Sequence, residues 1–179
     1  SRLLMTYGEE GEQSRTFTWM CGDTLQSAIL ELVVINDTLH FEGEGEIYQS
    51  RSGKAAYYKT SIASLPEGLN YSYRVLHPSD TTEWYSFEVP YKNEKRTFIF
   101  LGDVQDDYTG VTPDIFSEIF EQYPDVDFYL FGGDVIERPM SKYWDYWFSS
   151  MQDIPKVKPI LAAAGNHEYL KSLPRHLEE

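Results

Sequence analysis

Three apolar stretches in the second half of this chain each end in glycine followed by polar side chains. The stretches have the length of buried strands and cover residues 98–101, 128–131 and 160–164. Turn residues bound them, which favours strands buried in a parallel sheet. Directly after them come Gly102-Asp103-Val104-Gln105, Gly133-Asp134 and Gly165-Asn166-His167-Glu168. Since ligand sites of open parallel sheets lie beyond the carboxyl ends of the strands, we expect the three runs to converge on one crevice.

The spacing of such strands suits a pair of metal ions. Neighbouring strands lie about 4.8 Å apart, and the ions of a binuclear site are separated by roughly 3.5–4 Å. Glycine lets the backbone turn sharply, so the carboxylate or amide that follows can approach an ion closely. One glycine-aspartate pair after a strand is more often an ordinary turn than a metal site, but three such runs at successive strand ends favour a shared metal centre.

The order aspartate, glycine-aspartate, glycine-asparagine-histidine resembles the calcineurin-like metallophosphoesterases, and the two-part layout of the chain resembles their purple acid phosphatase branch. The resemblance implies a metal-dependent phosphoric ester hydrolase with two divalent or trivalent ions of manganese, iron or zinc. A hydroxide held between the ions would attack a phosphomonoester or phosphodiester. Asp103 would bind the first ion, Asp134 would bridge both, and Asn166 would bind the second. His167 would contact the phosphate and assist the leaving group.

Two positions depart from the family pattern. Gln105 stands where most members have histidine, and its amide oxygen is expected to bind a metal as glutamine does in some manganese-dependent members. Glu137 stands where purple acid phosphatases have an iron-binding tyrosine, so the coloured iron-tyrosinate centre is not expected. We expect Glu137, Arg138 and Glu168 to support the ligands or form salt bridges rather than to react.

Two helices are predicted between the three strands. The first begins with Thr112 as N-cap, Pro113 and Asp114, and ends before Pro124. The second is predicted over residues 141–152, where aromatic residues recur at helical spacing. Strands alternating with helices predict right-handed crossovers and a parallel sheet. The family resemblance implies that this α/β part, residues 92–179, is an incomplete metallophosphoesterase domain.

The first half of the chain reads instead as short strands separated by turns. The predicted strands cover residues 15–21, 28–35, 56–62, 71–76 and 83–89. This spacing predicts an all-β sandwich over residues 1–91. The segment around Tyr71 resembles the tyrosine corner of fibronectin type III domains, which implies that its hydroxyl hydrogen-bonds back to the preceding loop.

Charge and composition restrict the partners. The formal net charge of −14 argues against binding nucleic acid or anionic membranes. Bound cations would reconcile this charge with a phosphate-ester substrate, because they invert the local potential. No apolar run reaches the length of a membrane span. The single cysteine, Cys21, permits no intrachain disulfide and is expected to be a packing residue.

Several alternatives remain open from the sequence. The later histidine motifs of the family have no counterpart here, so we expect an N-terminal fragment that binds metals poorly and hydrolyses little alone. The chain could instead be a non-catalytic protein- or carbohydrate-binding module built on the sandwich. It could also be an assembly unit that self-associates through the incomplete sheet. An extracytoplasmic location follows only from the resemblance to secreted two-domain phosphatases, and the substrate is not indicated.

Overall fold

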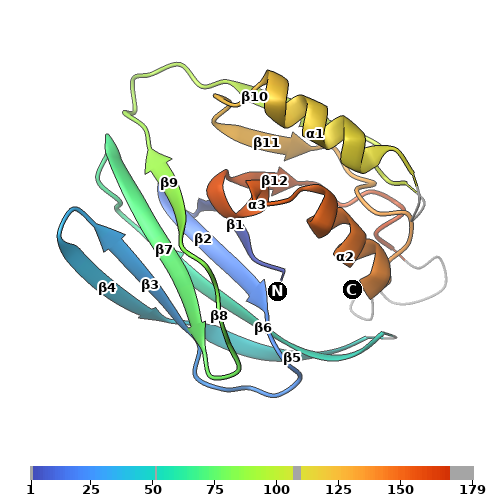
Figure 1. The fold of residues 1–179 in the computed structure, drawn as a ribbon, viewed down its shortest axis with the longest axis horizontal. Coiled ribbons are helices and arrows are strands. Elements are labelled where there is room, and N and C mark those ends of the chain that lie inside the picture. The colour runs from blue at the N-terminus through green and yellow to red at the C-terminus, as the bar shows by residue number, and fades with distance from the viewer. Residues whose placement is uncertain (1, 51, 107–109, 170–179) are drawn as a thin grey trace. The chain divides into compact units, whose positions relative to one another are not determined.

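Two sheets built from the first nine strands face each other in a β-sandwich (Figure 1). The structure is a computed structural model that describes residues 2–50, 52–106 and 110–169. One sheet has the order β1 (Leu4–Gly8), β2 (Gly11–Met20), β6 (Gly53–Ile62), β5 (Glu44–Ser50). The other has the order β4 (Asp37–Glu42), β3 (Ile29–Val34), β7 (Leu69–His77), β8 (Asp80–Thr81), and β9 (Tyr85–Val89) also pairs with β7.

Aromatic side chains from both sheets fill the space between them. The ring of Phe17 on β2 lies 4.6 Å from that of Tyr73 on β7 and 5.7 Å from that of Phe87 on β9. Leu30 and Leu32 on β3 are fully buried in the same cluster. Burying a large apolar side chain contributes about 1.5–3 kcal/mol, so this cluster holds the sandwich together. The predicted sandwich is therefore present.

All five strands predicted for this part of the chain occur, with bounds shifted by a few residues. The sequence analysis missed β1, β4, β5 and β8. Strands β4 and β5 are the outer strands of their sheets and are largely exposed, and edge strands carry charged residues instead of an apolar alternation. The Tyr71 hydroxyl donates a hydrogen bond of 2.9 Å to the Pro66 carbonyl, which confirms its predicted bond to the preceding loop.

The second part of the chain alternates strands and helices as predicted. The elements are β10 (Phe98–Leu101), α1 (Thr112–Gln122), β11 (Phe128–Phe131), α2 (Ser141–Ser150), α3 (Ile154–Val157) and β12 (Ile160–Ala162). The strands are parallel in the order β10-β11-β12. Leu101 pairs with Phe131, and Phe131 pairs with Ala162, so the carboxyl ends of the three strands lie in register.

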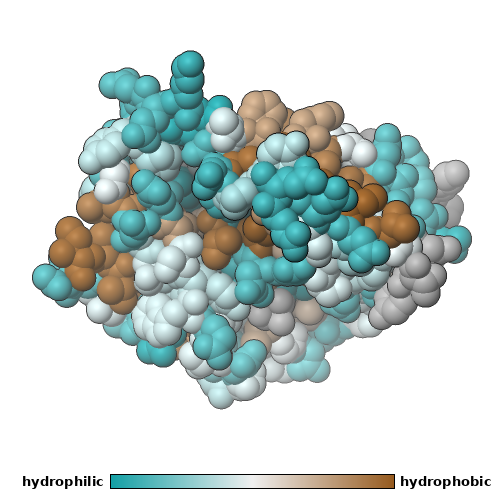
Figure 2. Space-filling view, turned by 45° about the horizontal axis from the view of Figure 1, so that its top comes forward, coloured by the Kyte–Doolittle hydropathy of each residue, from teal (hydrophilic) through white to brown (hydrophobic). Residues whose placement is uncertain are grey.

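Helices α1 and α2 cover one face of this sheet. Phe116 and Phe120 of α1 meet Phe131 and Tyr129 of β11 edge to face, and Trp147 of α2 also meets Phe131. Phe98 and Phe100 belong to the other face, where their side chains are 51% and 62% exposed. Figure 2 shows one side of the molecular surface, on which hydrophobic areas stand among hydrophilic ones. Within the described residues no helix has the length and hydropathy needed to cross a membrane.

Three local predictions were wrong. Thr112 is not the N-cap of α1, because Val111 takes that place and no side chain caps the helix from it. Helix α2 ends at Ser150 rather than 152, since Gln152 adopts a left-handed backbone with φ of 54°. Strand β12 ends at residue 162 rather than 164, and the short helix α3 was not predicted.

Candidate metal centre

The loops after β10 and β11 run side by side beyond the ends of their strands. The Gly132 amide donates to the Leu101 carbonyl at 2.7 Å, and the Asp103 amide donates to the Gly133 carbonyl at 3.3 Å. The Gln105 amide then donates to the Asp134 carbonyl at 2.9 Å. The backbone pairing of the sheet therefore continues into the first two predicted ligand runs and brings them together.

The loop after β12 joins the same group through Asp134. The Ala163 amide donates to the Phe131 carbonyl at 3.0 Å, which extends the pairing of β11 with β12. The His167 amide donates to Oδ1 of Asp134 at 2.7 Å. Asp134 thus contacts the first loop through its backbone carbonyl and the third loop through its carboxylate. The bridging role that the family resemblance implies for Asp134 stays a prediction.

Asp103 and Asp134 share an unusual backbone conformation. Both have φ of 52°, in the left-handed region. An L-residue there costs roughly 1–2 kcal/mol, and such strain persists where the surrounding structure fixes it, often at functional sites. Each aspartate follows a glycine at the end of its strand. The same strain recurring at two equivalent positions is an observation in favour of a functional role that does not depend on the motif.

Two glycines allow the loops to approach this closely. Gly133 has φ of 108°, and a Cβ there would lie 2.9 Å from the Gly165 nitrogen. A Cβ on Gly165 would overlap the carboxylate of Asp134 and lie 2.5 Å from the Asp134 nitrogen. Any larger residue at 165 would therefore displace the central aspartate.

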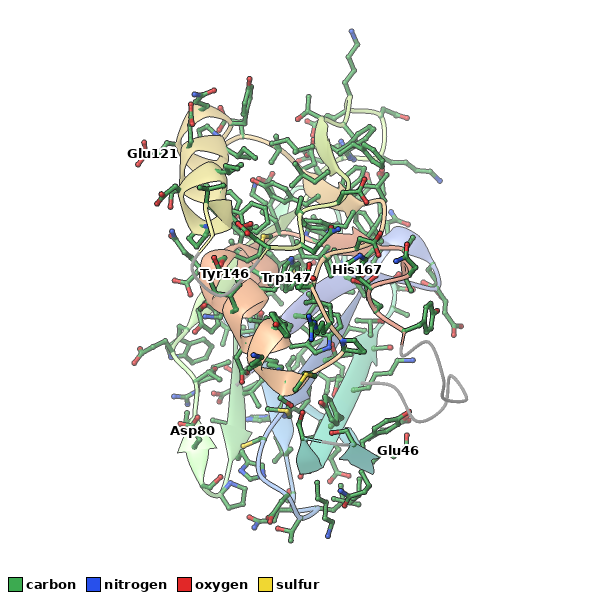
Figure 3. All side chains as sticks on the ribbon, turned by 90° about the vertical axis from the view of Figure 1, so that its right-hand side faces the viewer. Glu46, Asp80, Glu121, Tyr146, Trp147 and His167 are labelled. Carbon is green, nitrogen blue, oxygen red and sulfur yellow. The ribbon has the colours of Figure 1, made fainter. Side chains whose placement is uncertain are left out.

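His167 is held by Glu137. Its Nδ1 lies 2.9 Å from the Glu137 carbonyl oxygen and 3.7 Å from Oε2 of the same residue. Both side chains are partly exposed, and Figure 3 labels His167 on the loop after β12. Because a carbonyl only accepts, Nδ1 carries the proton and Nε2 is left for another partner. Arg138 is exposed, and its expected role as a supporting or salt-bridge residue stays a prediction.

Glu168 is buried and joins two of the loops. Its carboxylate accepts hydrogen bonds from the Gly165 amide and from the three successive amides of Asp134, Val135 and Ile136. Its expected role in supporting the metal ligands stays a prediction.

The oxygen donors fit a hard or borderline cation. Oε1 of Gln105 is buried and has no hydrogen-bond partner in the described part of the chain, and an unpaired buried acceptor is costly unless something else satisfies it. A cation would do so. Asp103 and Asn166 are exposed. Among the described residues no three histidine, cysteine, aspartate or glutamate side chains gather as a complete metal site. The metal ligands predicted from the sequence, Asp103, Gln105, Asp134 and Asn166, therefore stay predictions.

The sequence analysis missed Asp106, which anchors the first ligand loop to α1. Its Oδ2 accepts hydrogen bonds from the amides of Val111 and Thr112 at 2.7 and 3.2 Å. The Thr112 hydroxyl reaches the same oxygen at 3.1 Å and the Val104 carbonyl at 3.2 Å. Burial raises the pKa of Tyr146 on α2, and the Asp106 carboxylate adds to that shift. The one sequence signal for this contact was an acidic residue a few positions before a helix that begins with Thr112 and Pro113, since carboxylates stabilise helix N-termini.

Comparison with known proteins gives one family and two informative structures. Residues 96–179 match the family model described as calcineurin-like phosphoesterase. No curated protein matches the chain. A purple acid phosphatase, PPD1 from yellow lupin (Lupinus luteus) seeds, is similar with a TM-score of 0.76 and 16% identity, over 96% of this chain and 36% of that one. The structure of PhoD is similar with a TM-score of 0.62 and 11% identity, over 99% of this chain and 40% of that one.

At these identities the two structures carry the fold alone. The fold of this chain is similar to that of the purple acid phosphatase over 96% of its length. The chain spans two fifths or less of the length of either structure.

Proposed function

We propose that this chain, whose residues 96–179 belong to the calcineurin-like phosphoesterases, carries part of the active site of a metal-dependent phosphoric ester hydrolase. The observation that carries the proposal is the position of Asp134. Its strained backbone, its carboxylate bond to the His167 amide and its carbonyl bond to the Gln105 amide make it the meeting point of the three loops.

Four oxygen-bearing side chains would hold two metal ions. Asp103 and Gln105 would bind the first, Asn166 the second, and Asp134 both. Carboxylate and amide oxygens suit manganese, iron or zinc. When bound, such ions would supply a water nucleophile of lowered pKa and neutralise charge that develops on the phosphate. The buried, unpaired Oε1 of Gln105 supports this assignment, because a cation would satisfy it.

His167 would act on the ester oxygen that leaves. With Nδ1–H donated to the Glu137 carbonyl, Nε2 is the ring atom free to contact the substrate phosphate. Oε2 of the Glu137 carboxylate also lies 3.7 Å from Nδ1, beside the same edge of the ring. Once Nε2 has taken up a second proton from solvent, it would donate that proton to the leaving oxygen as the bond of that oxygen to phosphorus breaks, while Nδ1–H stays on the Glu137 carbonyl. This arrangement gives Glu137 a task that differs from the metal binding of the tyrosine in purple acid phosphatases.

The remaining assignments extend this proposal. We propose a fibronectin type III-like domain over residues 1–91, supported by the Tyr71 hydrogen bond, and a phosphoesterase domain over residues 92–179. A substrate of the phosphomonoester or phosphodiester class and an extracytoplasmic location are proposed from the likeness to purple acid phosphatase. Residues 1–179 alone are proposed to bind metals weakly and turn over slowly, because the four ligands assigned among the described residues are fewer than two metal ions need.

Hydrolysis of 4-nitrophenyl phosphate and its diester with added Mn²⁺ tests the proposal. We expect slow, metal-dependent turnover that Asp134→Asn reduces to the level of Mn²⁺ in buffer. The exposed aspartate Asp23 offers a matched control, so Asp23→Asn should behave as the original chain. Equal rates in the chain and in Asp134→Asn would contradict the proposed function. Turnover of about 1–10³ s⁻¹, typical of complete enzymes, would contradict the proposed weakness of residues 1–179 alone.

A further inference from the structure

The carboxylate of Glu168 makes an unusual set of contacts for a buried acid. Oε1 accepts from the amides of Val135 and Ile136 at 2.8 and 3.2 Å. Oε2 accepts from the amides of Asp134 and Gly165 at 2.9 and 2.6 Å. The residue is only 7% exposed. All four donors are backbone amides, and none of them is a charged side chain.

These four bonds exclude a direct metal-binding role. A carboxylate offers about four lone-pair positions, and here each is directed at an amide hydrogen. Glu168 therefore has no position left for an ion, although it lies in the same run as Asn166 and His167. Its function must act through the segments that it holds.

Those segments are two of the ligand loops. Three of the amides belong to the residues from Asp134 onward, and the fourth belongs to Gly165, which precedes Asn166. Asp134 is held in a left-handed conformation, which needs surrounding contacts to persist. One side chain thus fixes the strained aspartate and the loop that carries the next ligand at the same time.

Resting on the proposed function, we propose that Glu168 is a positioning residue that fixes the separation of the Asp134 and Asn166 ligand loops for the metal pair. A glutamine there has one acceptor oxygen and an NH₂ group that would face amide donors. It would leave about two buried amides unpaired and release one loop from the other. Removing a contact that orients metal ligands commonly weakens metal affinity about 10- to 100-fold.

The test is Mn²⁺ titration of the folded chain followed by paramagnetic broadening of backbone amide NMR signals. In the original chain we expect signals around Asp134 and around Asn166 to broaden at the same Mn²⁺ concentration. In Glu168→Gln both midpoints should rise by about 10- to 100-fold and separate from each other. Glu168→Asp, which keeps the charge, should recover part of the difference. Glu121→Gln on α1, an exposed site labelled in Figure 3, is the matched control.

Unchanged, coincident midpoints in folded Glu168→Gln would overturn the positioning role. If that variant does not fold, amide exchange in the original chain decides. The amides of Asp134, Val135, Ile136 and Gly165 should exchange slowly, and fast exchange would overturn the proposal. Asp134→Asn separates the two hypotheses: if it broadens at the same Mn²⁺ concentration as the original chain, the proposed metal site fails, whatever Glu168 does.

Discussion

At the scale of single residues, the site depends on positions where no side chain fits. Gly165 is the clearest case, since its missing Cβ is the space that the Asp134 carboxylate occupies. We expect Gly165→Ala to displace Asp134 and abolish Mn²⁺ binding while the far-UV circular dichroism spectrum is retained. Gly102→Ala is the matched control, because a Cβ at Gly102 would meet no described atom within 4 Å. Undiminished Mn²⁺ binding in Gly165→Ala would show that Asp134 is not a metal ligand.

Ile35 also has a strained backbone, but it belongs to the β-sandwich and to none of the predicted ligand runs. Ile35 lies in the two-residue loop between β3 and β4, where it has φ of 54° and is 75% exposed. A β-branched residue is strained there, so Ile35→Gly should raise the free energy of unfolding by about 1 kcal/mol. Urea denaturation measures the change. Ile35→Val keeps the β-branch and should give no gain, and equal stabilities of the two variants would contradict the strain.

At the scale of elements, three polar side chains interact across the neighbouring strands β4, β3 and β7. Glu31 on β3 faces Arg74 on β7 and His40 on β4 in the register of the sheet. The hydrogen bond from Arg74 lowers the pKa of Glu31. Folding therefore favours the ionised carboxylate. Its contribution is complete above the unfolded pKa of about 4.3 and is lost as the pH falls through the lower folded value.

The free energy of unfolding should consequently depend less on pH between pH 7 and pH 3 in Glu31→Gln than in the original chain. At pH 7 the variant should be less stable by about 0.5–1 kcal/mol, the worth of a good cross-strand pair. Well below pH 4 the difference should vanish. Urea midpoints between pH 7 and pH 3 measure both, with Glu46→Gln at an exposed position of β5 as control. A difference from the original chain that does not change with pH would rule out the linkage.

Some helices and strands could be predicted from the sequence and others could not, depending on the contacts that form them. The strands ending at Leu101 and Phe131 were predicted with their bounds, because each is a continuous apolar run. The burial expected of the first was wrong, since Phe98 and Phe100 are largely exposed. Edge strands such as β4 gave no such pattern. The ligand runs could be located because they follow strand ends directly. The amides that Glu168 binds could not, since residues 135 and 136 meet residue 168 only once the loops are folded.

At the scale of the whole molecule, bound cations would reconcile the net charge of −14 with the proposed phosphate-ester substrate. An anionic substrate would otherwise meet a repulsive field. Metal binding at the three loops is therefore the claim on which the account depends. It concerns Asp134 above all, because that residue contacts both of the other loops.

Binding of Mn²⁺ to residues 1–179, followed by electron paramagnetic resonance, tests this claim most directly. Asp134→Asn keeps an oxygen that can accept from the His167 amide but removes the charge, so the fold should survive. The account predicts weak, saturable Mn²⁺ binding to the original chain and to Asp23→Asn, and none to Asp134→Asn. Equal Mn²⁺ binding by all three chains would contradict it.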